Sequence, residues 1–295
     1  MTLDWALPAL RWALFADLGL VFGVPMAAVI TDSRDAVERW RGTLAVAALL
    51  GIALGLVGFV LVVANMAGLP PGALDRTLVM TLLTGAAIGW ALILRSAALA
   101  LYVGLALGRS PPLLIGAGGV AVATLAWSGH AAASDGAAGW IRLGGDIAHL
   151  LAALGWVGAL ALFAAQLWRP DPAGQVARAL ANFGSAGSVI VAVLALTGAA
   201  NLAFLMTASE LLSLNPSPYG RLLRLKLALL LIMLGLAALN RFTLVPRLEQ
   251  AQHGEARLSA MSRLRLSIAL EALAALAVLG LVAWAGTLDP LGIGH

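Results

Sequence analysis

Apolar runs recur along almost the whole chain, and short polar connections separate them. Many of these runs exceed the ~20 residues that a helix needs to cross the hydrocarbon core of a bilayer. A helix also satisfies its backbone hydrogen bonds within one segment, as a lipid environment demands. The sequence therefore predicts an all-α polytopic membrane bundle, a single transmembrane domain over residues 1–295. We place its eight spans at residues 8–30, 44–66, 77–107, 113–130, 145–167, 182–206, 220–240 and 266–287.

The composition excludes several other classes of protein. Hydrophobic residues make up 61% of the 295 residues and charged residues only 11%, whereas a soluble domain carries about 25% charged residues. No cysteine is present, which excludes disulfides, thiolate metal sites and iron–sulfur clusters. Any metal site must therefore use His, Met, Asp, Glu, Asn or backbone atoms.

Two features of the spans suggest a finer organisation. The third span is too long for one straight crossing, and we expect its first part, Thr77 to Ala87, to lie along the surface or to re-enter. Gly89–Arg95 in that span resembles Gly220–Lys226 in the seventh, and Leu18–Gly23 in the first resembles Leu154–Gly158 in the fifth. We therefore predict two parallel four-helix repeats, residues 1–135 and 140–295, about an axis along the membrane normal.

The basic residues predict the orientation in the membrane. They gather in the connections after spans 1, 3, 5 and 7, whereas the connections on the opposite side carry only Arg76 and Arg142. Cytoplasmic connections carry an excess of Lys and Arg, so the odd-numbered connections should be cytoplasmic and both termini should face outward. In a Gram-negative cell the protein would lie in the inner membrane with periplasmic termini. The net charge of +4 thus indicates topology rather than nucleic-acid binding.

Two of the four histidines flank the connection between spans 4 and 5. His130 closes the fourth span and His149 opens the fifth. If these spans are antiparallel, both imidazoles lie near the outer face of the bilayer. Imidazole suits copper and zinc, although a histidine at a membrane edge can also simply contact water or headgroups. Asp146 lies one helical turn before His149, and we expect it to cap the helix or to accept a hydrogen bond from the imidazole.

Further metal ligands are predicted at the outer ends of other spans. Met206 closes the sixth span, and Glu210 begins the polar connection that follows. A thioether prefers Cu(I), but methionine is also an ordinary filler of apolar space. The predicted copper site combines His130 and His149 with Met206 or Glu210.

The charged side chains of Arg11, Asp17, Arg95 and Lys226 fall within predicted spans. Charged groups at such depth pair with one another or extend toward the interface. Asp17 is the acid that we expect well inside a span, with Arg95 or Lys226 as its partner. The group is interpreted either as a structural ion pair or as a polar path for protons or ions.

Two blocks of the sequence resemble a known family. The first is D-x-x-H-L-L-A-A-x-x-W-x-G-x-L from Asp146 to Leu160, preceded by Ser128-Gly129-His130. The second runs from Pro218 through Tyr219-Gly220-Arg221-Leu222-Leu223 and Leu225-Lys226-Leu227-Ala228 to Ala238-Leu239-Asn240-Arg241-Phe242. Both are similar to the CopD family of bacterial inner-membrane copper-resistance proteins.

The resemblance implies a copper-handling protein that accepts copper at its periplasmic face and imports it or passes it on. It also implies a partnership with a small periplasmic copper-binding protein of the CopC type. The sequence contains no P-loop for an ATPase, and we expect the protein not to be an enzyme. An alternative is a haem-b electron-transfer protein with His130 and His149 as axial ligands, which a Soret band would reveal. A third is an assembly partner with no bound ligand.

Overall fold

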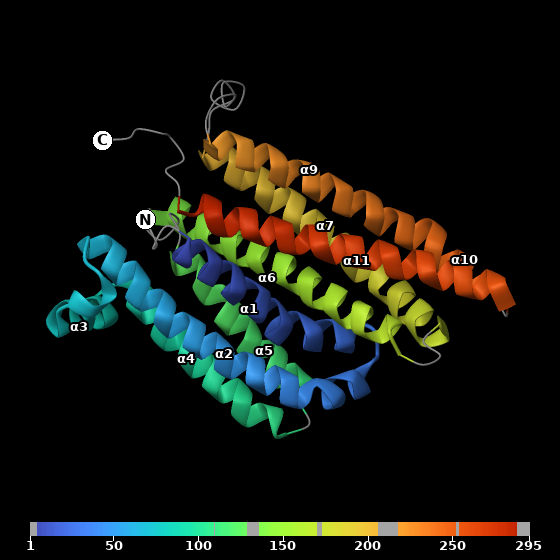
Figure 1. Ribbon diagram of the computed structural model, residues 1–295, viewed down its shortest axis with the longest axis horizontal. Coiled ribbons are helices and arrows are strands. Elements are labelled where there is room, and N and C mark those ends of the chain that lie inside the picture. The colour runs from blue at the N-terminus through green and yellow to red at the C-terminus, as the bar shows by residue number, and fades with distance from the viewer. Residues whose placement is uncertain are drawn as a thin grey trace.

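In the computed structural model, the chain forms a bundle of α-helices (Figure 1). The structure describes residues 5–108, 110–128, 136–169, 173–205, 218–251 and 254–287. Every regular element in these ranges is helical, and none of them contains a strand. The predicted all-α class is confirmed.

The helices correspond to the predicted spans. Within the described ranges, seven helical segments are long and apolar enough to cross a membrane. They are α1 (Ala6–Ile30), α2 (Arg34–Ala67), α4 (Ala87–Ala106), α6 (Gly136–Leu167), α7 (Ala173–Leu205), α9 (Pro218–Leu239) with α10 (Val245–Gln250), and α11 (Gly254–Ala285). A shorter apolar helix, α5 (Pro111–Ala123), continues as a 3-10 helix over Thr124–Ser128 and takes the place of the fourth span.

Several helices begin earlier than the predicted spans. Helices α2, α6, α7 and α11 contain 34, 32, 33 and 32 residues. At 1.5 Å per residue, 32 residues extend about 48 Å, whereas the hydrocarbon core is only about 30 Å thick. The helices therefore continue into the polar region, where good helix formers such as Arg and Glu extend them beyond the apolar part that hydropathy detects.

The predicted third span is two helices. Helix α3 (Arg76–Gly85) is separated from α4 by Ala86, which has an extended backbone with φ −107° and ψ 152°. The side chain of Asp75 accepts a hydrogen bond from the Thr77 backbone N–H at 3.3 Å and so begins α3. Figure 1 shows α3 as a segment apart from α4, whereas its expected placement along the surface or re-entry stays a prediction.

The helix contacts follow a related pattern in the two halves of the chain. In the N-terminal half, α1 packs on α2 and α5, and α4 packs on both α2 and α5. In the C-terminal half, α6 packs on α7 and α11, and α9 packs on α11. Between the halves, α1 packs on α6. In addition, α1 contacts α11, the last helix of the C-terminal half, and α6 contacts α5, the last helix of the N-terminal half. This pattern supports the two-repeat organisation, which stays a prediction.

Glycines allow the close approach of α1 and α6 that joins the two halves. A Cβ added at Gly23 would lie 2.6 Å from Leu154 O and 2.7 Å from the Cα of Gly158. Such backbone contact is open only to residues without a side chain. The two helix segments that the sequence comparison matched, Leu18–Gly23 and Leu154–Gly158, are therefore the segments that meet.

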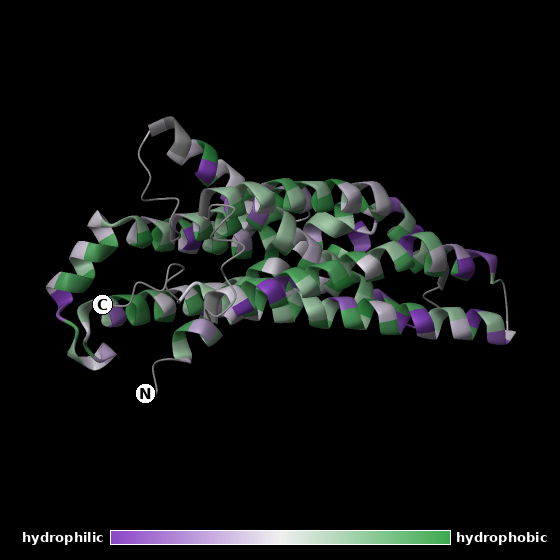
Figure 2. Ribbon diagram, turned by 90° about the horizontal axis from the view of Figure 1, so that it is seen from above, coloured by the Kyte–Doolittle hydropathy of each residue, from purple (hydrophilic) through white to green (hydrophobic). Residues whose placement is uncertain are grey.

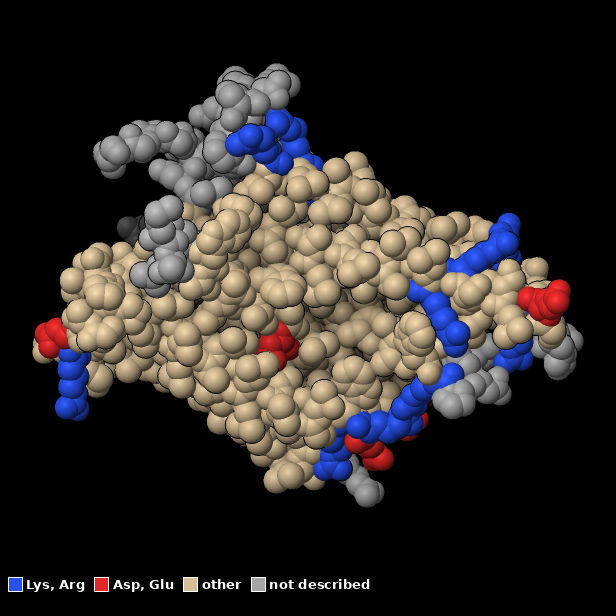
Figure 3. All heavy atoms as spheres, in the orientation of Figure 1, with Lys and Arg blue, Asp and Glu red and all other residues tan. Residues whose placement is uncertain are grey.

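The two ends of the bundle differ in charge. Apolar residues fill the middle of the helices and polar residues lie toward their ends (Figure 2). Figure 3 shows some basic side chains near the start of α9 and beside α3, whereas the larger group gathers at one end of the molecule. We call this the basic end; it holds the connections α1–α2, α4–α5, α6–α7 and α10–α11. At the opposite end the chain's first and last described helices meet, because Arg11 Nη1 donates to Gly286 O at 2.9 Å and the Trp5 and Trp284 rings pack edge to face.

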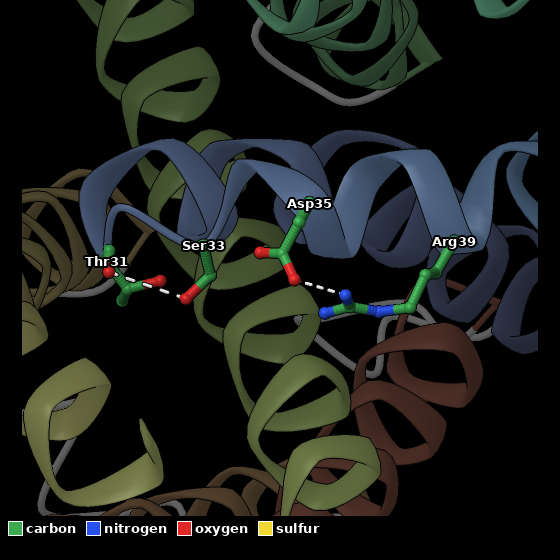
Figure 4. A network of polar contacts seen from close by, with 4 residues as sticks. All are labelled: Thr31, Ser33, Asp35 and Arg39. Atoms are coloured by element: carbon green, nitrogen blue, oxygen red, sulfur yellow. Dashed lines mark hydrogen bonds and ion pairs between the residues drawn. The ribbon is translucent and has the colours of Figure 1, made fainter. Parts of the chain in front are cut away.

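A tight turn at the basic end makes α1 and α2 antiparallel neighbours (Figure 4). Thr31 Oγ1 donates to Ala27 O at 2.8 Å, and Ser33 Oγ donates to Thr31 O at 3.4 Å. Asp32 between them has a positive φ of 53°, a conformation that aspartate tolerates better than most residues. One turn into α2, Arg39 forms an ion pair with Asp35.

Candidate functional site

Three of the predicted copper ligands, His130, Met206 and Glu210, lie outside the residues that the structure describes. His149 is the remaining predicted ligand, and it is the one histidine within the described ranges. The site is therefore built from His149 outward.

The imidazole of His149, on α6, is held by a threonine of α7. His149 Nδ1 lies 2.8 Å from Thr197 Oγ1, and Thr197 Oγ1 donates to Val193 O at 2.5 Å. A threonine hydroxyl has one hydrogen to donate, so we assign the proton of the first contact to His149 Nδ1. The Nε2 atom then keeps its lone pair, which is the form of the ring that binds a metal.

A second contact between α6 and α7 lies one turn away. Asn201 Nδ2 donates to Asp146 Oδ1 at 2.7 Å. Because the two helices are antiparallel, the pairs His149–Thr197 and Asp146–Asn201 lie next to each other along the helix interface. We refer to these four residues as the polar ladder.

The structure changes the role of Asp146. Helix α6 begins at Gly136, so Asp146 lies inside the helix. The prediction that Asp146 caps this helix is therefore wrong. The other predicted role, orienting the imidazole, belongs to Thr197 instead, since Asp146 Oδ1 is engaged by Asn201. Both differences follow from the early start of α6 and from the neighbouring helix, which the sequence spacing does not reveal.

Two further residues shape the surroundings of His149. A Cβ added at Gly198 would lie 3.7 Å from His149 Cε1, an ordinary van der Waals distance, so this glycine of α7 faces the imidazole. Lys226 on α9 is the charged residue that interacts electrostatically with His149. Within the described part of the chain, Lys226 has no hydrogen-bond or ion-pair partner.

Several arginines contact the C-terminal ends of other helices. Arg95 donates from Nε to Thr124 Oγ1 at 2.9 Å and from Nη2 to Thr124 O at 3.4 Å, where α5 ends. A helix C-terminus has unpaired carbonyl groups and a partial negative charge, which a cation stabilises. The same contact is made by Arg11 with Gly286 O at 2.9 Å, by Arg41 with Ala106 O at 2.6 Å and by Arg265 with Leu167 O at 2.9 Å.

The expected ion pair of Asp17 is therefore not formed. Among the described residues, the ion pair found is that of Arg39 with Asp35. Arg95 reaches the end of α5 instead, so the prediction that it neutralises Asp17 is wrong. The Asp17 side chain is buried against Gly51 of α2, where an added Cβ would lie 2.6 Å from Asp17 Oδ2. This oxygen accepts no hydrogen bond.

A second buried acid, Glu271, was missed by the sequence analysis. The predicted eighth span placed it near an end, but α11 begins at Gly254 and carries it toward the middle of the helix. Its Oε1 accepts a hydrogen bond from Trp156 Nε1 at 2.8 Å, and its Oε2 accepts one from Asn240 Nδ2 at 3.0 Å. The available signal was an acid within a long apolar run, which marks a functional candidate in a membrane protein.

Glu271 lies at the wall of a cavity of about 550 Å³ between α6, α7, α9 and α11. The lining is mostly apolar, with Trp156, Phe163 and Phe183 among its residues. Asn240 also lines it and begins a π-helical segment, Asn240–Leu244, that joins α9 to α10. π-Helical turns often occur at functional sites.

The described residues do not by themselves complete a metal centre. No group of three or more His, Asp and Glu side chains within them could hold an ion. The polar ladder contributes His149 Nε2 and the carboxylate of Asp146. Ligands beyond these stay predictions.

Comparison with known proteins gives consistent matches. Residues 1–140 match the family "Copper resistance protein D-like, N-terminal domain", and residues 177–285 match the family "Copper resistance protein D". The chain is 37% identical over 299 residues to copper resistance protein D of Pseudomonas syringae pv. tomato, covering 96% of each sequence. No solved structure matches the chain.

Proposed function

The chain belongs to the copper resistance protein D family, and from this premise we propose that it binds copper at the end of the bundle opposite the basic end and imports it or passes it on. The family supports a role in copper resistance, and the apolar helices support a multi-pass membrane protein. The copper site, its direction of transfer and its partner are the proposed parts.

The observation that carries the proposal is the fixed imidazole of His149. Thr197 engages Nδ1 at 2.8 Å, which leaves Nε2 as the metal-binding atom. A histidine whose second nitrogen is hydrogen-bonded has a defined tautomer and ring orientation, and this improves metal affinity. The absence of cysteine from the chain makes imidazole its strongest ligand for copper.

The rest of the ligand set is drawn from the sequence. His130 is the second proposed ligand, and Met206 or Glu210 is the third. A shell of two or three protein ligands leaves a coordination position open, and such a position lets a donor protein exchange copper with the site.

The orientation follows from charge. With the basic end in the cytoplasm, the polar ladder lies toward the periplasmic side of an inner membrane, and both termini are periplasmic. Copper would then arrive from a small periplasmic protein of the CopC type. No nucleotide-driven step is proposed, so transport would use a gradient or facilitated diffusion.

Copper binding and uptake by the purified full-length protein test the proposal. In lipid nanodiscs, His149→Ala should lower copper affinity by at least the roughly 100-fold that loss of an outer-shell partner can cause. His253→Ala, a change in the basic connection, is the matched control and should leave affinity unchanged. In liposomes, copper uptake should likewise depend on His149 and not on His253.

Two outcomes would overturn the proposal. Equal copper affinity in wild type and in the His130→Ala/His149→Ala double variant would remove the proposed site and favour an assembly role. A Soret band in the purified protein that disappears with either histidine would favour the haem alternative instead.

A further inference from the structure

Glu271 is the most deeply buried acid among the described residues, and its surroundings are organised around it. The side chain is 2% exposed, and each of its oxygens accepts one hydrogen bond, from Trp156 Nε1 and from Asn240 Nδ2. These donors come from two other parts of the fold, α6 and the π-helical segment after α9. Neutral donors stabilise a carboxylate, but they do not cancel its charge.

No counter-charge reaches Glu271 within the described part of the chain. Arg241 and Glu249 are the other charged residues of the cavity, and the Arg241 guanidinium is engaged by Gly184 O at 2.7 Å and by Ser188 Oγ. Helices α6 and α7 add no titratable group to the cavity lining.

Several other charged residues of the packed helices lie against other groups. On α1, Arg11 binds Gly286 O and Asp17 faces Gly51; on α11, Arg265 binds Leu167 O. On α9, Lys226 lies near His149 and interacts with it electrostatically. An isolated carboxylate at this depth is expensive, and a group so placed binds a cation or becomes neutral.

The amide of Asn240 is suited to both protonation states of Glu271. Asn240 is 5% exposed, its Nδ2 donates to Glu271, and its Oδ1 is buried without any hydrogen-bond partner. An asparagine amide offers two donors on one side and an acceptor on the other. After a half-turn of the amide, Oδ1 would face Glu271 and could accept a hydrogen bond from a protonated carboxyl, while the indole N–H of Trp156 donates in either state.

We propose that Glu271 is a proton-binding site, with Asn240 as the partner that rotates between the carboxylate and the carboxylic acid. The carboxylate takes one proton from water in the cavity to give the acid, and it returns the same proton when it ionises. A proton needs no further ligand. A metal ion would need more donors than the Glu271 carboxylate and Asn240 Oδ1, and no histidine or methionine lines this cavity.

The position of the site suggests its use. The cavity lies where α7 and α9 leave a gap, and its lining continues to Pro246 and Glu249 toward the basic end. Protons can therefore reach Glu271 from that end while copper occupies the polar ladder at the other. Coupling of proton release to copper movement rests on the proposed function, whereas proton binding itself does not.

Labelling with dicyclohexylcarbodiimide tests proton binding without copper, because this apolar reagent modifies protonated carboxyls in apolar surroundings. With the full-length protein in liposomes, cleavage after Arg265 and mass spectrometry report on a peptide in which Glu271 is the sole glutamate. We expect Glu271 to be labelled several-fold faster than the exposed Glu249 and the labelling to fall as the pH rises. Asn240→Leu removes both hydrogen-bonding roles and should move that dependence to higher pH, because the carboxylate loses a donor, whereas Asn65→Leu on α2 should leave it in place.

The outcomes separate the alternatives. No labelling of Glu271 at any pH, or labelling of wild type that is independent of pH, would overturn the proposal. Suppression of labelling by sodium chloride but not by choline chloride would assign the site to sodium and would also overturn it. In copper-loaded liposomes with an entrapped pH dye, Glu271→Gln should abolish proton movement that accompanies copper. If wild type moves no copper, the proposed function fails while the labelling result still decides the proton site.

Discussion

The two halves of the bundle use their buried polar groups differently. In the N-terminal half, Arg95 and Tyr102 bind backbone carbonyls of neighbouring helices, at Thr124 and Val21. In the C-terminal half, polar side chains of different helices bind one another, as in His149–Thr197, Asp146–Asn201 and Glu271–Asn240. Helices α7 and α9 also bury far less of their surface than α1 does, and a cavity opens between them.

From this difference we infer that the N-terminal half is a scaffold and that the C-terminal half carries the proposed sites. A side chain that binds a helix end, or Val21 O four residues before Pro25 of α1, satisfies a carbonyl that lacks a helical partner. Such a contact has little reason to change. A contact between two side chains can be exchanged for a ligand or a proton. The N-terminal half thus holds the C-terminal half in place, and the α1–α6 crossing is where the two meet.

Disrupting that crossing should have the largest effect. In Gly158→Leu the new side chain would overlap the backbone of Gly23. We expect a loss of about 3 kcal/mol in the free energy of unfolding, the upper range for an overpacked core, measured by denaturation in mixed micelles. Gly144→Leu on the same helix, where an added Cβ meets nothing within 4 Å, is the control and should change little. Equal losses in both variants would show that the crossing is not the joint between the halves.

Arg95 and Lys226, which the predicted repeat places at matching positions, offer a direct contrast between the two halves. Arg95→Met removes two hydrogen bonds at the end of α5, and we expect a loss of about 2 kcal/mol in the free energy of unfolding. Lys226→Met removes a side chain with no partner among the described residues, and it should change that energy by less than about 1 kcal/mol. Copper affinity should change more in Lys226→Met than in Arg95→Met, because Lys226 interacts electrostatically with His149. If both variants lose the same stability, the contrast between the halves is wrong at this pair.

The threonine that holds His149 should affect function but not folding. Thr197→Val keeps the shape of the side chain and removes the hydroxyl that fixes Nδ1. Copper affinity should fall by about 10- to 100-fold, as expected when a partner of a metal-bound histidine is lost, while the unfolding midpoint stays near that of wild type. Thr197→Ser keeps the hydroxyl and should retain the affinity. An unchanged copper affinity in Thr197→Val would show that the hydrogen bond to Nδ1 does not contribute to copper binding.

The fold was largely predictable because hydropathy detects the part of each helix that lies in lipid. Eight apolar segments and the separate segment before α4 were read from the sequence alone. The ends of α2, α6, α7 and α11 were not, since a helix that continues into water loses the apolar signal and keeps its backbone hydrogen bonds. That error had consequences, because the early starts of α6 and α11 place Asp146 inside a helix and Glu271 away from a helix end.

The site was predictable only where a single residue carried the signal. His149 stood out as a histidine at the edge of a span, whereas Thr197 and Asn201 are ordinary residues of an apolar helix until α7 is placed against α6. The partners of the cations could not be inferred from the sequence. Acidic residues are the usual expectation for Arg, and the sequence does not show that the end of another helix lies nearer. Asn240 gains its position from a π-helical turn for which the sequence gives no simple pattern.

The smallest effect is expected at Asp17, where the N-terminal half departs from its own pattern. A buried carboxylate that neutralised a cation would cost about 3–5 kcal/mol to remove, because the cation would be left unpaired. Arg95 is bound to the end of α5, however, and Asp17 Oδ2 has no hydrogen-bond partner. Asp17→Asn keeps the shape and leaves no cation alone, so the free energy of unfolding should change by less than about 1 kcal/mol. A fall of about 3 kcal/mol in the same mixed-micelle measurement would mean that a cation does depend on Asp17, and the N-terminal half would then contain an ion pair of its own.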